Sequence, residues 1–165
     1  MGELTVRLAE VGDAEAIRVI YNTEVTTSTS TFDLVPRALE DQERWLAARS
    51  GAFAAIVAVD GDGTIVGFAS LSPYKERAAY RTTVEDSVYV DPSRQGEGIG
   101  RVLLIRLVEI ARTSGFHTVM ARIEASGAAS RALHARCGFE LVGIEREVGR
   151  KFNRWLDVAV MQLLL

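Results

Sequence analysis

The sequence predicts a mixed α/β fold of the α+β type, built as one domain over residues 1–165. A length of 165 residues suits one domain with a full hydrophobic core. Apolar residues recur with the two-residue period of strands in some segments and with the helical period in others. These segments follow one another in the order β-α-α-β-β-β-α-β-α-β-β, and no linker or internal repeat divides them.

The chain begins with an expected strand and an expected helix. Leu4–Leu8 alternates between apolar and polar residues, and Asp13 is a candidate N-cap for a helix that runs to about Glu24. The next stretch, Thr26–Asp33, is too rich in β-branched and hydroxyl residues to favour a longer helix. It has two interpretations, a polar surface loop or a substrate-facing loop with Phe32 as its apolar tip.

A second helix and a hairpin are expected next. The helix is predicted over Leu39–Arg49, and Gly51 ends it. Strands at Phe53–Val59 and Thr64–Leu71 flank the turn Asp60–Gly63, whose Asp-Gly pairs are a strong hairpin signal. The remaining elements are predicted as strand, helix, strand, helix, strand and strand: Val84–Val90, Ile99–Ser114, Thr118–Ile123, Ala128–Arg136, Leu141–Ile144 and Leu156–Leu164.

Three glycines lie between the expected strand at 84–90 and the helix at 99–114. Gly96, Gly98 and Gly100 place a turn before a helix N-terminus, where free N–H groups and the helix dipole suit a phosphate. The spacing differs from the G-x-G-x-x-G dinucleotide fingerprint, and no Gly-Lys-Ser/Thr P-loop is present. The residues alone do not decide between a turn that binds a phosphate and a glycine turn without a ligand.

Composition narrows the classes of function. Hydrophobic residues make up 48% and charged residues 25%, and the net charge of -3 gives no electrostatic case for nucleic acid. No apolar run approaches the roughly 20 residues that span a bilayer, and the N-terminus lacks a signal-peptide core. Cys137 stands alone, so no internal disulfide is expected. We therefore expect a cytoplasmic protein with no membrane or nucleic-acid partner and no metal.

Several strings together resemble one enzyme family. Gln95-x-x-Gly98-x-Gly100, preceded by Arg94, is similar to the pyrophosphate loop of the GCN5-related N-acetyltransferase (GNAT) superfamily. Nearly the whole chain resembles the phosphinothricin / methionine sulfoximine N-acetyltransferase branch. The strings that carry this second resemblance are Ser28–Asp33, Ala79–Val90, Leu133–Phe139 and Gly149–Val158. Gly127 stands where that branch usually has Asn, so a side-chain hydrogen bond to the pantetheine arm is expected to be missing or supplied by water.

The resemblance implies a fold, a co-substrate and an assembly. The fold would be the GNAT acyl-CoA N-acyltransferase fold, with a central mixed, mostly antiparallel β-sheet flanked by helices. Acetyl-CoA would be the co-substrate in a direct transfer within a ternary complex, and a homodimer is expected because the family is often dimeric. The residues that the resemblance assigns to acetyl-CoA are Val88, Tyr89, Val90, Gln95, Gly96, Glu97, Gly98, Ile99, Gly100, Arg101 and Ser130.

Acetyl transfer to an amine calls for a base and for a proton on the leaving thiolate. By resemblance, Glu85 is the catalytic base on the central strand, and an apolar site would raise its pKa toward a useful range. The alternative is an ordinary strand carboxylate that faces solvent or pairs with an arginine. His134, at a place where related enzymes often carry a tyrosine acid, is the second candidate catalytic group. A histidine packed against the sheet is the alternative there.

Residues just ahead of Glu85 are the expected acceptor pocket, by the same resemblance. Lys75 and Arg81, with Tyr74 nearby, suit an α-carboxylate and a second polar head group. Glu85 and Asp86 are adjacent in a strand, so only one of them can face the cleft. The expected substrate-binding residues are Phe32, Tyr74, Lys75, Glu76, Arg81, Val84, Glu85 and Asp86.

The resemblance thus predicts an N-acetyltransferase that acts on the α-amine of a small amino-acid-like acceptor. The expected acceptors are of the phosphinothricin, methionine sulfoximine or methionine sulfone type. Two alternatives remain. One is an acetyltransferase for a protein N-terminus or another amine, and the other is a non-catalytic module that senses acetyl-CoA.

Overall fold

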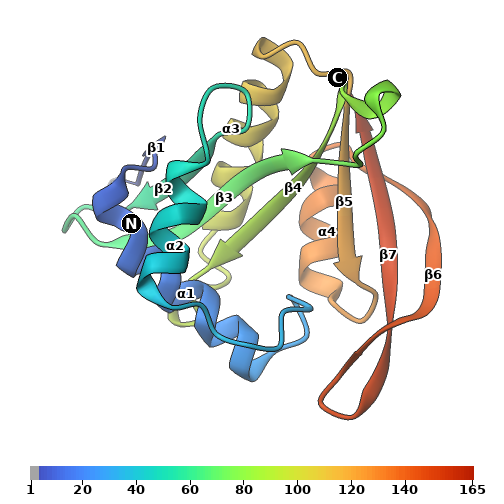
Figure 1. The fold of residues 1–165 in the computed structure, drawn as a ribbon, viewed down its shortest axis with the longest axis horizontal. Helices are drawn as coiled ribbons and strands as arrows, with labels where there is room; N and C mark the ends of the chain where they lie inside the picture. The colour runs from blue at the N-terminus through green and yellow to red at the C-terminus, as the bar shows by residue number, and fades with distance from the viewer. Residues whose placement is uncertain (1–3) are drawn as a thin grey trace.

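The computed structural model describes residues 4–165, in which seven strands form one sheet with helices on both faces (Figure 1). The elements are β1 (Thr5–Leu8), α1 (Ala14–Thr27), α2 (Leu39–Ala47), β2 (Ala55–Val59), β3 (Ile65–Pro73), β4 (Thr83–Val90), α3 (Ile99–Thr113), β5 (Thr118–Glu124), α4 (Ala128–Arg136), β6 (Glu140–Lys151) and β7 (Arg154–Leu164). Short 3₁₀ turns precede α1, β4 and α3. The mixed α/β fold class and the predicted order of elements are confirmed.

The sheet has the strand order β1-β2-β3-β4-β5-β7-β6. All neighbouring strands are antiparallel except β4 and β5, which are parallel. This parallel pairing covers only Thr83–Glu85 against Thr118–Met120, and beyond it the two strands diverge (Figure 1). From residue 86 to residue 90, one edge of β4 therefore has no strand partner among the described residues.

The helices divide between the two faces of the sheet. Helix α3 packs on one face through aliphatic side chains such as Leu103 and Leu107, which are fully buried. Helices α1 and α2 pack on the other face around Tyr21 and Phe68. In the part of the chain that the structure describes, no helix is long and apolar enough to cross a membrane.

Alternation along β4 divides its side chains between these faces. Val84 and Val88 join the core under α3, whereas Tyr89 joins the core under α1 and α2. Glu85 consequently faces the side of α1 and α2. Asp86 faces the side of α3 and α4.

Helix α1 is longer at its C-terminal end than predicted. The prediction ended it near Glu24, but the helix continues to Thr27. It does so because the hydroxyls of Thr23 and Thr27 donate hydrogen bonds to the carbonyl oxygens of Val19 and Thr23. These bonds satisfy the hydroxyl groups that would otherwise compete for the backbone of a neighbouring turn.

Two predicted helix ends differ in detail. Asp13 precedes α1 as expected but makes no side-chain cap bond, because its carboxylate accepts hydrogen bonds from Arg7 at 2.7 and 2.9 Å. Helix α2 ends at Ala47, two residues before the predicted end. Gly51, with φ of 60°, lies in the turn that follows.

Strand β6 is much longer than the predicted strand Leu141–Ile144. It runs from Glu140 to Lys151 and pairs along most of its length with β7. A tight turn joins the two strands, and in it Phe152 and Asn153 have φ of 49° and 57°. Glycines and charged residues interrupt the apolar positions of β6, so no alternating pattern marked it.

Candidate functional site

The glycine turn forms the N-terminal end of α3. Gly96 and Gly98 both have φ of 84°, a conformation that L side chains rarely adopt. A Cβ added at either position would meet nothing within 4 Å, so the turn faces open space. Within residues 4–165, the backbone N–H groups from Gln95 to Gly98 donate no hydrogen bond to another backbone group. Such free N–H groups at a helix N-terminus fit a pyrophosphate.

Gly100 lets α3 approach Leu133 of α4 closely, beside β4. A Cβ there would lie 3.2 Å from Leu133 and 3.6 Å from Val90. Val88 and Val90 lie half-buried on this face, beside the unpaired edge of β4. Tyr89 points to the opposite face, so only its backbone lies at that edge. The structure thus brings the glycine turn and residues 88–90 together at one end of the gap between β4 and β5.

Arg94, which precedes the predicted loop, and the predicted acetyl-CoA-binding residues Glu97, Arg101 and Ser130 have partners of their own or lie at the surface. Arg94 contacts Glu97 and Asp60, each at 2.9 Å, and these two carboxylates raise its pKa. Its guanidinium therefore ties the β2–β3 hairpin to the glycine turn. Arg101 is exposed in the first turn of α3, and Ser130 is half-buried in the first turn of α4.

Glu85 lies where β4 and β5 part. It is the last residue of β4 paired with β5, and it faces Ser72 across the β3–β4 pair. Burial raises its pKa above the ordinary value of 4.5, although the positive charge of Arg122 opposes this. Arg122 is itself held by Glu145 in a two-bonded ion pair, with both distances 2.7 Å. A half-buried carboxyl with a raised pKa is suited to accept a proton near neutral pH.

His134 and Asp86 form a buried pair on the opposite face of β4. The His134 Nε2 lies 2.8 Å from Asp86 Oδ2, and its Nδ1 lies 2.8 Å from the carbonyl oxygen of Ser130. Burial lowers the pKa of His134, but the hydrogen bond and charge of Asp86 outweigh this and raise it. Both partners can accept a hydrogen bond, so a protonated ring would donate from both nitrogens, and this agrees with the raised pKa.

A cavity of about 130 Å³ opens on the α1 and α2 side of the sheet, next to Glu85. Ser72 and Ser87 lie nearest to that carboxyl, one across the strand pair and one two residues along β4. The cavity is polar, with two guanidinium groups and no carboxylate in its wall. The lining residues are Tyr21, Arg37, Trp45, Arg49, Phe68, Ser70, Ser72, Ser87 and Tyr89.

Four of the predicted acceptor residues lie in the connection between β3 and β4. The Lys75 Nζ is 4.8 Å from the centre of the Tyr74 ring and 5.2 Å from that of Tyr80. Glu76 and Arg81 are exposed beside them. This connection leads directly into Thr83, two residues before the candidate base.

The other predicted acceptor residues do not share one face. Val84 is fully buried in the core under α3. Asp86 is hydrogen-bonded to His134. Val84 and Asp86 therefore both lie on the face of the sheet opposite Glu85. Phe32 is 39% exposed and packs beside Gly149 of β6, where an added Cβ would clash with its ring.

Two carboxylates fix the hydroxyl-rich loop that carries Phe32. The Ser30 hydroxyl donates to Glu24 of α1 at 2.5 Å, and the Thr29 hydroxyl donates to Glu124 of β5 at 3.0 Å. The hydroxyls of Thr29 and Ser30 therefore tie this loop to β5 and α1, and Phe32 stays partly exposed beside β6.

Sequence reasoning missed both cavity arginines. Arg37 lies in the connection before α2, and Arg49 follows that helix, so no motif or spacing marks either residue. A usable signal existed only for the serines, because Ser70 and Ser72 alternate along β3 and so share a face, although the predicted strand ended at Leu71.

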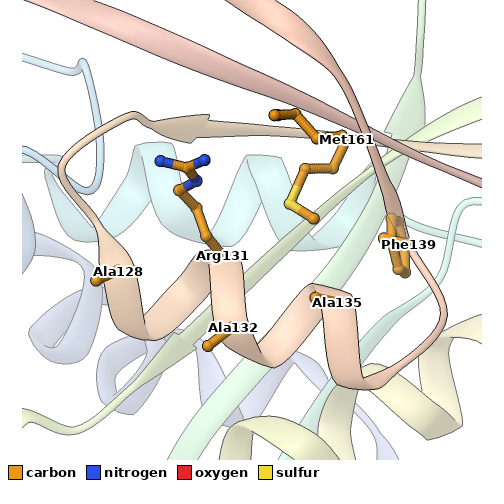
Figure 2. A pocket seen from close by; sticks show the side chains of 7 residues that line it. Ala128, Arg131, Ala132, Ala135, Phe139 and Met161 are labelled. Carbon is orange, nitrogen blue, oxygen red and sulfur yellow. The ribbon is translucent and has the colours of Figure 1, made fainter.

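A second hollow, of about 440 Å³, lies between α4 and the strands β6 and β7 (Figure 2). Ala128, Ala132 and Ala135 of α4 form one wall, and Met161 reaches toward them from β7 (Figure 2). It is mostly apolar and lies on the face of the sheet opposite Glu85.

The sequence was compared with known families and proteins. Residues 6–160 match the family model described as an acetyltransferase (GNAT) domain. The chain is 41% identical over 162 residues to an L-methionine sulfoximine/L-methionine sulfone acetyltransferase from Pseudomonas paraeruginosa. That match covers 98% of this chain and 94% of the relative.

Two solved structures have nearly the same fold. A GNAT superfamily phosphinothricin acetyltransferase from Sinorhizobium meliloti, in complex with AcCoA, has a TM-score of 0.94 at 36% identity, covering 98% of this chain and 88% of that one. A ribosomal-protein-alanine N-acetyltransferase from Brucella melitensis also has a TM-score of 0.94, at 40% identity, covering 98% and 99%.

Proposed function

Because this chain belongs to the GNAT family of acetyltransferases and is therefore an acyltransferase, we propose that it acetylates the α-amine of a small amino-acid-like acceptor. One observation carries the proposal. Glu85 lies at the end of the β4–β5 pairing, with the polar cavity on its own face of the sheet and the glycine turn at the far end of the gap.

Acetyl-CoA is the proposed donor. The pyrophosphate would lie on the N–H groups of Gln95 to Gly100, and the pantetheine arm along the unpaired backbone of Val88 to Val90. When bound, acetyl-CoA supplies the activated acetyl thioester. Two features support this assignment, namely the open turn at Gly96 and Gly98 and the AcCoA held by the related structure. No metal takes part in the proposal.

Two side chains of this chain move the protons. Glu85 takes a proton from the acceptor amine, and its raised pKa suits that role near neutral pH. His134 is the proposed source of the proton for the leaving thiolate, because Asp86 raises its pKa and lies on the same face of β4 as Val88. Transfer is direct, without a covalent enzyme intermediate.

The proposed acceptors are phosphinothricin, methionine sulfoximine and methionine sulfone. The names of the related enzymes support this class. The cavity beside Glu85 supports it too, since a volume of about 130 Å³ suits a small molecule. Lys75, Arg81 and Phe32 would border the entrance.

A second candidate is acetylation of a protein N-terminus. It is favoured by the likeness to the ribosomal-protein-alanine N-acetyltransferase. With its N-terminus in the cavity, the rest of a bound peptide would have to extend out through the entrance, past Tyr74 and Lys75. The experiment below includes a peptide for this reason.

We also propose a cytoplasmic homodimer with no nucleic-acid or membrane partner. The net charge of -3 supports the absence of a nucleic-acid partner, and the single free cysteine, Cys137, suits a reducing compartment. Strand β6 supports the dimer, because it is an edge strand with exposed Val142 and Ile144.

The proposed function is tested by following coenzyme A release. Acetyl-CoA is offered with phosphinothricin, methionine sulfoximine, methionine sulfone, methionine and a short peptide with an N-terminal alanine. We expect turnover of the first three, and in Glu85→Gln a fall in kcat on the order of 100-fold, with loss of the low-pH limb of kcat/KM.

Three other outcomes would each contradict a different part of the proposed function. Turnover of the peptide alone would replace the small acceptor by a protein N-terminus. Tight binding of acetyl-CoA without turnover of any acceptor would favour a sensor module. An unchanged pH profile in Glu85→Gln would remove Glu85 from the role of base.

A further inference from the structure

We infer that Arg37 and Arg49 form an anion-binding subsite for the side-chain head group of the acceptor. The preferred acceptor is then an amino acid whose side chain ends in a negatively charged oxo group, such as a phosphinate. This inference rests on the proposed function, because it assigns the far end of the same small molecule.

The wall of the cavity carries two positive charges and no negative charge of its own. Arg37 and Arg49 are its two cationic residues, and its other polar groups are the hydroxyls of serines and tyrosines. None of the lining residues is an aspartate or a glutamate. A guanidinium taken out of water is costly unless an anion lies beside it, so the cavity favours a ligand that brings one.

Arg49 is the less compensated of the two arginines. Its Nη1 donates to the carbonyl oxygen of Leu71 and, at 2.8 Å, to the hydroxyl of Ser72. Its guanidinium lies 4.5 Å from the centre of the Trp45 ring. Among the ion pairs of residues 4–165, none includes Arg49. Burial lowers its pKa, and the charge of Arg37 lowers it further.

Arg37 is held in place but only partly neutralised. Its guanidinium stacks 3.9 Å from the centre of the Tyr21 ring and 5.4 Å from that of Trp45. The nearest carboxylate, Asp33, lies at 3.6 Å, is half-exposed, and already accepts a hydrogen bond from the Tyr21 hydroxyl. A rigid, stacked guanidinium of this kind is ready to bind an oxyanion.

The spacing from Glu85 fits the two ends of one small molecule. Ser72 is the register partner of Glu85 in the β3–β4 pair, and its hydroxyl accepts a hydrogen bond from Arg49, so one residue of β3 connects the position of the candidate base with the first arginine. The Phe68–Tyr89 pair at the far end of the cavity is four residues further along β4, roughly 13 Å away. An amine at Glu85 and a head group at the arginines therefore lie on the same face of the sheet, within the length of this cavity.

The test compares acceptors that differ in the charge of the head group. Phosphinothricin has an anionic head, methionine sulfone a neutral oxo head, and methionine has no oxo group. In Arg49→Gln and Arg37→Gln we expect KM for phosphinothricin to rise on the order of tenfold to 100-fold. We expect a smaller rise for the sulfone, little change for methionine, and little change in kcat. Arg49→Lys, which keeps the charge, should recover part of the loss.

Arg106→Gln is the matched control, because that arginine is exposed on α3 and pairs with Glu109. A binding readout accompanies the kinetics. The chain has two tryptophans, so Trp155→Phe leaves Trp45, in the cavity wall, as the only one. Its fluorescence should respond to phosphinothricin in the presence of coenzyme A. The response should be lost in both Arg→Gln variants.

Equal losses for phosphinothricin and methionine would overturn the inference, as would an unchanged KM for phosphinothricin in both variants. If no amino acid is turned over but Trp45 still responds to phosphinothricin, the subsite stands and the proposed function fails. If phosphinothricin is turned over and neither arginine matters, the function stands and the subsite fails.

Discussion

His134 has an acceptor on each ring nitrogen, the Asp86 carboxylate on Nε2 and the Ser130 carbonyl oxygen on Nδ1. The residue is 4% exposed, so a positive charge on its ring would be taken out of water and would depend on Asp86. The pair proposed to hold a proton for the leaving thiolate is therefore also a contributor to stability.

The sign of this contribution follows from the raised pKa of His134. A raised folded-state pKa stabilises the protein fully below the unfolded value of 6.5, and the contribution is lost as pH rises through the folded value. In Asp86→Asn we expect a loss of roughly 2 kcal/mol at about pH 5.5 and a smaller loss at about pH 9, measured by urea unfolding.

Glu109→Gln is the control, since it removes one carboxylate from an exposed pair on α3. It should change stability little at either pH. An Asp86→Asn loss that is the same at both pH values would contradict the charged pair.

At the level of residues, the sequence predicted candidate groups within recognisable strings and missed those that lie outside them. Glu85 and His134 were predicted because the strings around them resemble a family. Arg37 and Arg49 lie on the two sides of α2, and only the packing of that helix over β3 brings them to the cavity. No local sequence pattern indicates that these two arginines line the same cavity.

At the level of elements, the start of α3 depends on one glycine. Gly98 is the N-cap residue, with φ of 84°, and it sets the direction of the N–H groups that precede the helix. A side chain there would find space but would strain the backbone. Binding of a pyrophosphate should therefore be more sensitive to this position than the fold is.

We expect Gly98→Ala to raise KM for acetyl-CoA roughly tenfold and to destabilise the protein by about 1–2 kcal/mol. Steady-state kinetics and thermal unfolding measure the two effects. Gly115→Ala is a matched control, because Gly115 has φ of 85° at the other end of α3 and also faces open space. It should show the same loss of stability with an unchanged KM. Equal changes in KM would contradict the assignment of the turn.

Two elements whose ends were predicted wrongly show which structural information local sequence patterns lack. The end of α1 was placed too early because hydroxyl residues are poor helix formers on average. Here, however, Thr23 and Thr27 bond back to the helix. Strand β6 was cut short because its continuation past Ile144 is set by pairing with β7, a contact that no local period reports.

At the level of the whole molecule, the apolar surface gathers at the β6 edge of the sheet. Leu141, Val142, Ile144 and Val148 are between 42% and 60% exposed on one strand. An unpaired edge with apolar side chains promotes association, and a second copy of the chain is the proposed partner.

We expect light scattering to give twice the mass of one chain for the wild type. In Val142→Asp with Ile144→Asp the mass should fall toward that of one chain, because buried carboxylates oppose association. Val19→Asp is the control, since Val19 is 52% exposed on α1. A wild-type mass of one chain, or a dimer unaffected by the β6 changes, would contradict this interface.

The short pairing of β4 with β5 also decides how the sheet holds together. It joins β1–β4 to β5–β7 through three residue pairs, fewer than any other neighbouring strands share. Acetyl-CoA in the gap would contact both parts of the sheet, so part of its binding free energy would stabilise the association of β1–β4 with β5–β7. Binding of acetyl-CoA should therefore also stabilise the sheet. The backbone amides of β4 should then exchange with solvent more slowly once the gap is filled.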